Sequence, residues 1–274
     1  MQVSPSDLQN DRDHKVTAVL YGYFALSGDQ EESAICCIAG FVAEADDWNE
    51  FDHAWKAALS GLAIGFDASA CLHGTGVFQS WDIQRRHAMV VALSQVLARF
   101  ALVPVGTLVV RKHFARLSSA DRAILSAEGI ESPLDLIFYD WTERIICRVH
   151  EQSEKISLLL CHDSQAEQYC KLFNKHLRRY LLGPHLTGEL AFAKCCDYNH
   201  LQAAKLLSET AILAEARKRF LRPAESQFPI PQSLRQIADH ALQQGRFEAA
   251  ELHKLTARIK SMAKANPHRK QAPR

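Results

Sequence analysis

Two apolar, β-rich runs near the start of the chain restrict the fold more than any other feature of the sequence. The run KVTAVLYGYFAL (15–26) is rich in β-branched and aromatic residues, and it leads into Ser27-Gly28-Asp29, which has the composition of a turn. The run SAICCIAGFVA (33–43) follows after a few residues and is too short for a long helix. Two strands joined by so short a connection predict an antiparallel hairpin.

Beyond this hairpin, segments with helical spacing alternate with short apolar runs. Predicted helices begin after Asp46 or Asp47 and after Asp82, and others cover 132–152, 165–182 and 200–220. Predicted strands cover 70–78, 102–110, 155–164 and 187–193. The continuous apolar run KISLLLC favours a central strand, and Pro104 favours an edge position or the first residues of its strand. The pattern predicts an α/β fold with a mixed sheet flanked by helices, an arrangement that ribonuclease-H-like folds share with other α/β designs.

The two ends of the chain differ from this main domain, which we place at residues 16–220. Residues 1–15 are polar and predict a flexible leader, and the proline-bearing segment 221–233 predicts a linker. Residues 234–264 predict two helices around Gln244-Gly245, which would form a C-terminal helical hairpin. The basic tail 265–274 completes the chain.

Charge and cysteine content exclude several classes of protein. The formal net charge is +1, which is not that of a strongly basic nucleic-acid-binding protein. No apolar run reaches the roughly 20 residues that a membrane-spanning helix needs, so we expect no membrane contact. The eight cysteines form no Cys-x-x-Cys motif, and the polar start has no secretory signal. We therefore expect a cytoplasmic protein with reduced thiols.

A series of short motifs runs in order through the main domain. The first strand ends in YFALSGD (23–29), the second leads through GFVAEADDW (40–48), and CLHG (71–74) comes next. A later apolar run ends in SLLLCHD (157–163), and LQAAK (201–205) opens a helix. The series resembles domain-of-unknown-function family 3800, whose members look like metal-dependent nucleases with a ribonuclease-H-like fold.

The resemblance implies carboxylates at positions where this chain has none. The patterns Tyr-Ile-Asp-Glu-Ser-Gly-Asp, Glu-Phe-His-Ala and Leu-Gln-x-Ala-Asp of the family would place acids at Ala25, Leu26, Cys71 and Lys205. Asp163 is the acid that this chain retains. Mg²⁺ needs oxygen ligands, and an ammonium group such as that of Lys205 repels a divalent cation. The resemblance therefore implies a degenerate site without a metal cofactor, in a pseudoenzyme.

Other polar residues near these motifs have two interpretations each. Asp163 would pair with Lys205 in the degenerate site, or it would cap the helix that begins at Gln165. Asp29 would be a shifted site residue or a turn residue. Gln202 is a candidate for binding a substrate, with packing as its alternative role, and His73 is a second candidate for substrate binding.

A metal site is the weaker alternative. Relocated ligands for Mg²⁺ or Mn²⁺ would be Asp29, His73, Asp163, Asp197 and His200. Zinc is less favoured, because cysteines usually fill core space and these spacings match no standard zinc finger. Its ligands would come from three short groups: Cys71-x-His73, Cys161-His162 and Cys195-Cys196-Asp197-x-x-His200.

Three functions follow from these readings. The leading one is a degenerate nuclease-like protein that acts as a binding or regulatory module on nucleic acid. The second is an active metal-dependent nuclease, a phosphodiester hydrolase whose ligands have moved. The third is a protein-interaction scaffold, in which the helices of 234–264 bind a protein partner or a second copy of the chain.

Overall fold

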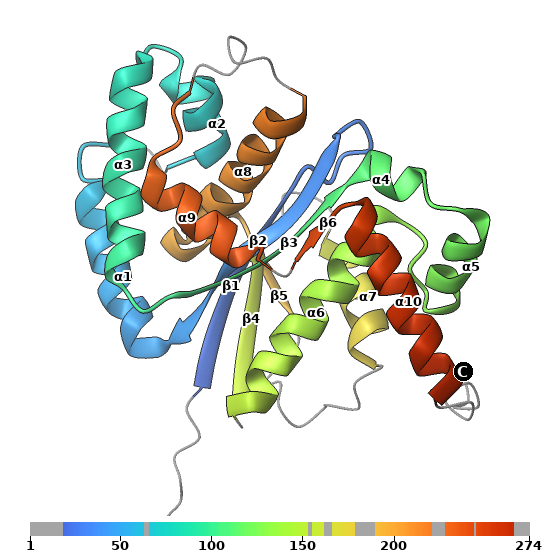
Figure 1. Ribbon diagram of the computed structural model, residues 1–274. Coiled ribbons are helices and arrows are strands. Elements are labelled where there is room, and N and C mark those ends of the chain that lie inside the picture. The colour runs from blue at the N-terminus through green and yellow to red at the C-terminus, as the bar shows by residue number, and fades with distance from the viewer. Residues whose placement is uncertain are drawn as a thin grey trace, which may run out of the picture.

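The apolar runs of the sequence form one mixed sheet, which two layers of helices cover (Figure 1). The computed structural model describes residues 19–62, 66–152, 155–161, 166–178, 190–220, 228–243 and 245–265. Its strands in chain order are β1 (Val19–Ser27), β2 (Ile35–Glu44), β3 (Val103–Val110), β4 (Lys155–Cys161), β5 (Ala191–Ala193) and β6 (Arg246–Phe247). The predicted α/β fold with a mixed, helix-flanked sheet is confirmed.

The strand order across the sheet is β5-β4-β1-β2-β3-β6. Strand β2 runs antiparallel to β1 and β3, and the other neighbouring pairs are parallel. The predicted initial hairpin is confirmed, with Ser27 opposite Cys37 near its turn. Strand β4 lies between β1 and β5, as its continuous apolar sequence predicted. Because β1, β4 and β5 are parallel, their carboxyl ends meet at one edge, where open α/β sheets usually bind ligands.

The helices divide between the two faces of the sheet (Figure 1). One layer consists of α1 (Ala45–Ala58), α2 (Ala68–His73), α3 (Ile83–Arg99), α8 (Asn199–Arg219) and α9 (Gln232–Ala241). The other layer consists of α4 (Arg111–Ala115), α5 (Ser119–Ala127), α6 (Pro133–Gln152), α7 (Ala166–Leu177) and α10 (Ala249–Ala265). Each layer packs on its own apolar core, which is why the central strands are apolar on both faces.

Strand β1 shows how the alternation of side chains positions the functional edge. Phe24 and Leu26 belong to the core under α6, where Phe24 packs edge-to-face on Trp141. Ala25 and Ser27 face the opposite layer and contact α8. Successive residues of a strand point to opposite faces, so only one of two adjacent side chains at this strand end can face α8.

The strand predicted over 70–78 is wrong. This segment forms α2 and a short 3₁₀ turn, η2 (Gly76–Phe78). The Asp67 carboxylate accepts a hydrogen bond from the backbone N–H of Ala70 and caps α2, and Gly74 ends it with a left-handed φ of 70°. A short apolar run fits a strand or a helix, and here the two caps favour the helix.

The predicted C-terminal helical hairpin is not confirmed. Helix α9 packs on α3, α8 and β3, whereas α10 packs on α4, α5 and β6 on the other face. Between them, β6 pairs with Leu108 and Val109 of β3. The C-terminal segment therefore completes the sheet of the main domain, because a short strand separates the two helices.

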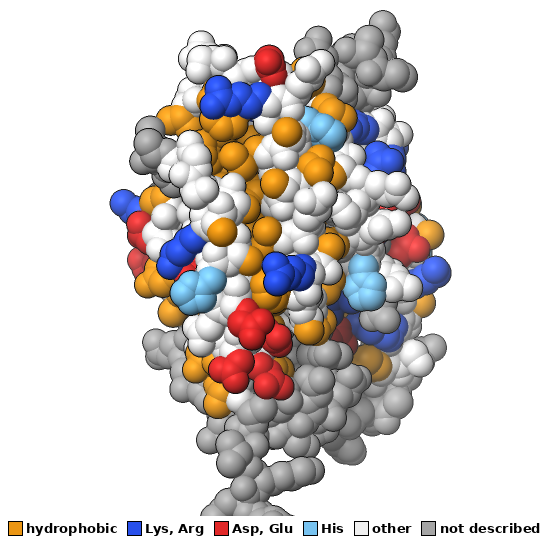
Figure 2. Space-filling model, turned by 90° about the vertical axis from the view of Figure 1, so that its left-hand side faces the viewer, with side chains coloured by type: hydrophobic (Ala, Val, Ile, Leu, Met, Phe, Trp, Pro, Cys, Tyr) orange, Lys and Arg blue, Asp and Glu red, His pale blue; other side chains and the backbone are white. Residues whose placement is uncertain are grey.

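The surface agrees with the near-neutral net charge. Figure 2 shows one face of the molecule, with basic side chains scattered over it, one group of acidic side chains below its centre and other acidic side chains near its edges. No helix among the described residues is long and apolar enough to cross a membrane. The predicted leader 1–15 lies outside the described residues, as do 221–227 of the predicted linker and 266–274 of the predicted tail.

Candidate functional site

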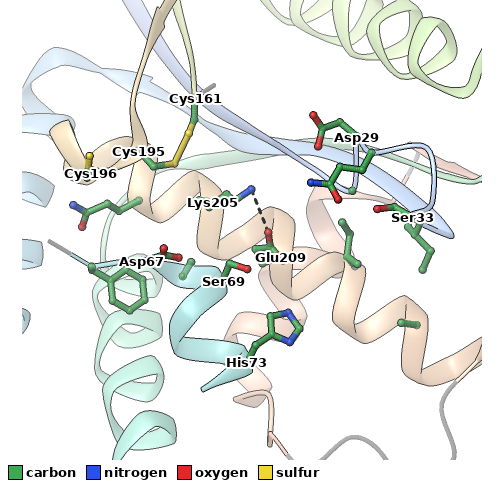
Figure 3. Close-up of a pocket in the computed structure, with 18 of the residues that line it drawn as sticks. Asp29, Ser33, Asp67, Ser69, His73, Cys161, Cys195, Cys196, Lys205 and Glu209 are labelled. Atoms are coloured by element: carbon green, nitrogen blue, oxygen red, sulfur yellow. Dashed lines mark ion pairs between the residues drawn. A yellow bond between two sulfur atoms is a disulfide. The ribbon is translucent and has the colours of Figure 1, made fainter. Parts of the chain in front are cut away.

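A cavity of about 770 Å³ lies at the carboxyl ends of β1 and β4. The turn after β1, helices α2 and α8, and a 3₁₀ turn, η4 (Cys195–Asp197), line this cavity, which we call the β1 pocket (Figure 3). Seven residues that the sequence singled out line it together: Asp29, His73, Gln202 and Lys205, and Cys161, Cys195 and Cys196 from the predicted zinc groups. Its volume is within the range of small-molecule binding sites.

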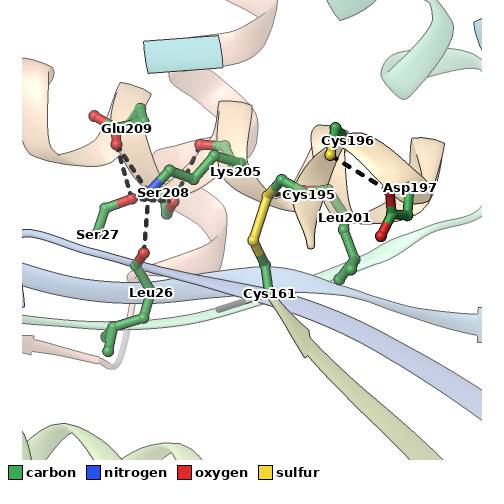
Figure 4. Close-up of a disulfide and its surroundings, with 10 residues drawn as sticks. All are labelled: Leu26, Ser27, Cys161, Cys195, Cys196, Asp197, Leu201, Lys205, Ser208 and Glu209. Carbon is green, nitrogen blue, oxygen red and sulfur yellow. Dashed lines mark hydrogen bonds and ion pairs between the residues drawn. A yellow bond between two sulfur atoms is a disulfide. The ribbon is translucent and has the colours of Figure 1, made fainter. Parts of the chain in front are cut away.

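Lys205 is the centre of a polar network in the β1 pocket (Figure 4). Its ammonium group donates a hydrogen bond to the backbone carbonyl of Leu26 at 3.1 Å and lies 3.2 Å from the Glu209 carboxylate. The Ser27 hydroxyl donates to the same carboxylate oxygen at 3.0 Å and lies 2.8 Å from the hydroxyl of Ser208. The lysine is thus held by an acid one helical turn away and by the end of β1.

Three members of this network were not predicted from the sequence as site residues, namely Ser27, Ser208 and Glu209. One signal was present, because Lys205 and Glu209 are four residues apart on a predicted helix and such pairs face each other. The contact between Ser27 and Ser208 joins residues 181 positions apart and depends on how α8 crosses β1.

The two positions before Ser27 differ in what they present to the β1 pocket. Ala25 is fully buried among Cys161, Leu201 and Ala204, on the side of α8. The Leu26 side chain points into the core on the opposite face, so only its backbone carbonyl reaches Lys205. Neither residue offers a side-chain oxygen or nitrogen, so this strand end contributes only backbone groups and Ser27.

Asp29 is held from two sides in the turn after β1. Its carboxylate accepts a hydrogen bond from the hydroxyl of Tyr169 at 2.5 Å. Arg111 donates to the carbonyls of Gly28 and Asp29 at 3.1 and 2.8 Å. Gly28 has a φ of 67°, and a Cβ there would collide with the backbone carbonyl of Ile35. These contacts give Asp29 a structural role in the turn, and Asp29 also lines the pocket.

Gln202 forms part of the pocket wall with a fixed orientation. Its side chain is 3% exposed, and its Oε1 accepts a hydrogen bond from the indole N–H of Trp55 at 3.1 Å. Among the described residues, its Nε2 donors have no partner. The amide is therefore positioned to donate to a ligand.

The two residues predicted on the CLHG segment have different environments. His73 is exposed and lines the β1 pocket from α2, on the side facing Lys205 (Figure 3). Cys71 is fully buried, and desolvation raises the pKa of its thiol to about 12. Cys71 is therefore a protonated core residue at neutral pH, and only His73 can contact a ligand.

A disulfide joins Cys161 at the end of β4 to Cys195 in η4, with 5.4 Å between the two Cα atoms (Figure 4). The expectation that all thiols are reduced is therefore wrong for this pair. Sequence alone could not pair them, because they are 34 residues apart and meet through the parallel pairing of β4 and β5.

Two other predicted residues, His200 and Asp197, do not line the β1 pocket. His200 stacks on Tyr23 with 4.5 Å between the ring centroids and packs edge-to-face on Trp48, and burial lowers the pKa of its imidazole. Asp197 is exposed and accepts a weak hydrogen bond from the Cys196 thiol. Asp163 and the neighbouring histidine at 162 lie outside the described residues.

The described members of the predicted ligand sets do not assemble a metal centre. Within the part of the chain that the structure describes, no group of three or more His, Cys, Asp or Glu side chains could hold a metal ion. Two cysteines of the predicted zinc groups, Cys161 and Cys195, bond to each other. No model of a known protein family matches this chain, and no curated protein sequence matches it. The geometry of the β1 pocket is therefore the main guide to function.

Proposed function

We propose that this chain is a nuclease-like protein without metal-dependent hydrolysis, and that its β1 pocket binds single-stranded nucleic acid without a metal ion. One observation carries the proposal. The Lys205 ammonium lies between the Leu26 carbonyl and the Glu209 carboxylate, at a position where the family resemblance implies a metal-ligating acid. A fixed positive charge there opposes a divalent cation and suits a phosphate group.

The strand order supports a ribonuclease-H-like sheet as the basis of this proposal. The resemblance implies a ribonuclease-H-like fold, and the observed mixed sheet with its initial antiparallel hairpin is compatible with that fold. Of the motifs that carry the resemblance, YFALSGD covers the end of β1, SLLLC lies in β4 and LQAAK lies in α8. The β1 pocket lies beside these segments, and Lys205 lines it from α8.

The donors of the pocket fit a phosphate or a base edge. An ammonium group has three N–H donors, and the described residues take up two of those of Lys205. Lys194 and the Gln202 amide also line the pocket. At its rim, Phe220 is 40% exposed, and the Lys112 ammonium lies 4.5 Å from the centre of its ring. An exposed aromatic ring beside a cation is a suitable surface for stacking a base.

The acids of the pocket favour a weak, single-strand ligand over a long duplex. Asp29, Asp67 and Glu209 outnumber Lys194 and Lys205, so the described lining of the pocket has no excess of basic side chains. Duplex binding depends mainly on many phosphate contacts, whereas single strands also gain from stacking. A cavity of about 770 Å³ also suits one or two unstacked nucleotides better than a helix.

The test is a binding measurement without metal. Fluorescence anisotropy of a labelled single-stranded oligonucleotide, in EDTA and at increasing salt, should show binding that weakens as salt rises. Lys205→Met should weaken it several-fold and reduce the salt slope by about 0.7, the value for one phosphate contact on a single strand. The control is Lys56→Met, which removes an exposed lysine that is also paired with an acid four residues away but lies outside the pocket.

A cleavage assay tests the absence of hydrolysis. DNA and RNA are incubated with Mg²⁺ or Mn²⁺, and an Asp163→Ala preparation purified in the same way controls for contaminating nuclease. We expect no difference between the two preparations. Cleavage that disappears in Asp163→Ala would replace this proposal with an active nuclease, and absence of binding in EDTA would refute the binding role.

The scaffold function has no comparable support. Helices α9 and α10 bury Leu234, Ala238, Leu252 and Leu255 in the two cores. Their apolar sides are therefore used within the fold.

A further inference from the structure

The wall of the β1 pocket next to β4 is a short segment with few buried side chains. It contains β5 and η4 and runs from Ala191 to Tyr198, and we call it the β5–η4 segment. All of its side chains are exposed or only partly buried. Burial of apolar surface is the main source of local stability, so this segment gains little from its side chains.

Backbone pairing adds a limited number of contacts. Strand β5 pairs with β4 over three residues, from Ala191 to Ala193. Beyond the strand, η4 contacts the start of α8, where the Cys195 sulfur lies 3.5 Å from the carbonyl of Leu201. A strand of three residues is at the lower limit of the usual strand length. The covalent bond from Cys195 to Cys161 is therefore a major attachment of the β5–η4 segment to the sheet.

The position of this bond connects it to the site. Both cysteines and the neighbouring Cys196 line the β1 pocket (Figure 3). Lys194, on the other side of Cys195, also lines it. A bond that lines a cavity of this size is within reach of a small thiol. The residues that it positions include a lysine proposed above to contact the ligand.

We infer that the Cys161–Cys195 disulfide is a thiol–disulfide exchange site that fastens the β5–η4 segment, and that a small dithiol or thiol releases this wall of the pocket. In the exchange with a dithiol, a reductant thiolate attacks one sulfur of the disulfide, forms a mixed disulfide with that cysteine and releases the other cysteine as a thiolate. The second thiol of the reductant then attacks the mixed disulfide and releases the first cysteine. The reductant becomes a cyclic disulfide, and two electrons and two protons pass to Cys161 and Cys195. The inference concerns the wall itself and does not depend on the ligand.

Cys196 provides a matched control next to the bridge. It is exposed, lines the same pocket and is not in the disulfide. Desolvation and the hydrogen bond to Asp197 raise the pKa of its thiol, which makes it a poor attacking thiolate at neutral pH. Cys196→Ser therefore removes a neighbouring thiol and keeps the bridge.

The first measurement establishes the bridge. The protein is purified without reductant, unfolded in the presence of an alkylating agent and examined by mass spectrometry, before and after treatment with dithiothreitol. Cys161 and Cys195 should be alkylated only after reduction, in the wild type and in Cys196→Ser. Alkylation of both without reduction would refute the inference.

The second measurement compares the local stability of the β5–η4 segment in the oxidised and the reduced protein. Hydrogen–deuterium exchange of peptides covering 190–198 should become at least tenfold faster on reduction, and equally fast in Cys195→Ser without reductant. Peptides from β1 and β2 should be unchanged, which separates local release from unfolding. Equal exchange in the oxidised and reduced protein over 190–198 would overturn the inference, and Cys196→Ser should respond to dithiothreitol as the wild type does.

Discussion

Helix α8 carries two acid–base pairs with the same spacing of four residues, and their surroundings differ. Near its start, Lys205 and Glu209 are 22% and 14% exposed and face the β1 pocket. Near its end, the Glu215 side chain is 2% exposed and pairs with Arg219, and Arg246 of β6 lies 3.6 Å from it. The same sequence pattern therefore serves an open site at one end of the helix and a closed network at the other.

The closed network joins separate parts of the chain. Arg219 also pairs with Glu248, and Arg246 pairs with Asp239 of α9 at 3.0 Å. These contacts attach β6 and the two C-terminal helices to α8. Within the described part of the chain, the pocket pair has partners from α8 and β1 alone, and these partners lie within reach of two of the three lysine donors. A buried acid with several cationic partners indicates a structural role, and a partly exposed pair beside a cavity indicates a binding role.

The largest expected effect is from breaking the closed network. Glu215→Gln should lower the free energy of unfolding by about 3–5 kcal/mol, because it removes the buried carboxylate that Arg219 and Arg246 share and leaves them only their more exposed partners Glu248 and Asp239. Glu209→Gln should cost about 1 kcal/mol or less, because that pair is partly exposed. Urea unfolding of both variants measures the difference. Equal losses would show that the two pairs do not differ in role.

The next largest effect concerns the covalent attachment beside the pocket. Cys195→Ser should lower the free energy of unfolding of the oxidised protein by about 3–4 kcal/mol, which is the loop-closure value for a crosslink between residues 34 apart. Cys196→Ser should change it by less than about 0.5 kcal/mol, because that side chain is exposed. Unfolding in urea without reductant compares them. A loss in Cys195→Ser no larger than in Cys196→Ser would contradict this prediction.

The features around the β1 pocket also show which parts of the structure could be predicted from the sequence. The hairpin of β1 and β2 was predictable, because two apolar runs separated by a short turn specify their own pairing. The motif LQAAK singled out Lys205, and the structure places this lysine in the wall of the β1 pocket. Neither the disulfide nor the contact of Ser27 with α8 was predictable, because each joins elements that are far apart in the sequence and meet only in the folded protein.

The helix at 68–73 and the strand β6 were missed for a different physical reason. Both are short, so their apolar patterns do not distinguish helix from strand or loop. At 68–73, the helix is favoured because the Asp67 carboxylate accepts a capping hydrogen bond from the backbone N–H of Ala70. Strand β6 exists because β3 offers a free edge to Arg246 and Phe247, which is a property of the assembled sheet.

A smaller effect is expected on the affinity for single-stranded nucleic acid when the pair of Lys205 and Glu209 is broken. Lys205→Met should weaken single-strand binding several-fold while the free energy of unfolding changes by about 1 kcal/mol or less. Arg219→Met should show the opposite, with a loss of stability and little change in binding measured where both variants are folded. Anisotropy and urea unfolding on the same preparations give both values. If Lys205→Met loses stability and keeps its binding, then Lys205 has a structural role, and the binding role assigned to it is wrong.

The smallest effect is a pH dependence at the first turn of α8. Burial lowers the pKa of His200 from its ordinary value of 6.5, and Tyr23 and Trp48 surround the neutral ring. As pH falls below about 6.5, the unfolded chain binds a proton at this histidine before the folded chain does, so the unfolded state gains stability. The free energy of unfolding should therefore decrease between pH 6.5 and the lower folded pKa, with no contribution above that window.

His200→Phe isolates this contribution, since it keeps an aromatic ring against Tyr23 and removes the titrating group. The pKa of His113 is also lowered, chiefly by burial and by Arg219 at the other end of α8, so the wild type alone would mix two sources. Urea unfolding at pH 7.5 and pH 5.5 should give a smaller decrease in His200→Phe than in the wild type, and His113→Phe provides the same comparison for the closed end. Identical decreases in the wild type and His200→Phe would mean that the ring near Trp48 is hydrated and titrates as in the unfolded chain. The solvent-accessible part of α8 would then include His200 as well as Lys205 and Glu209.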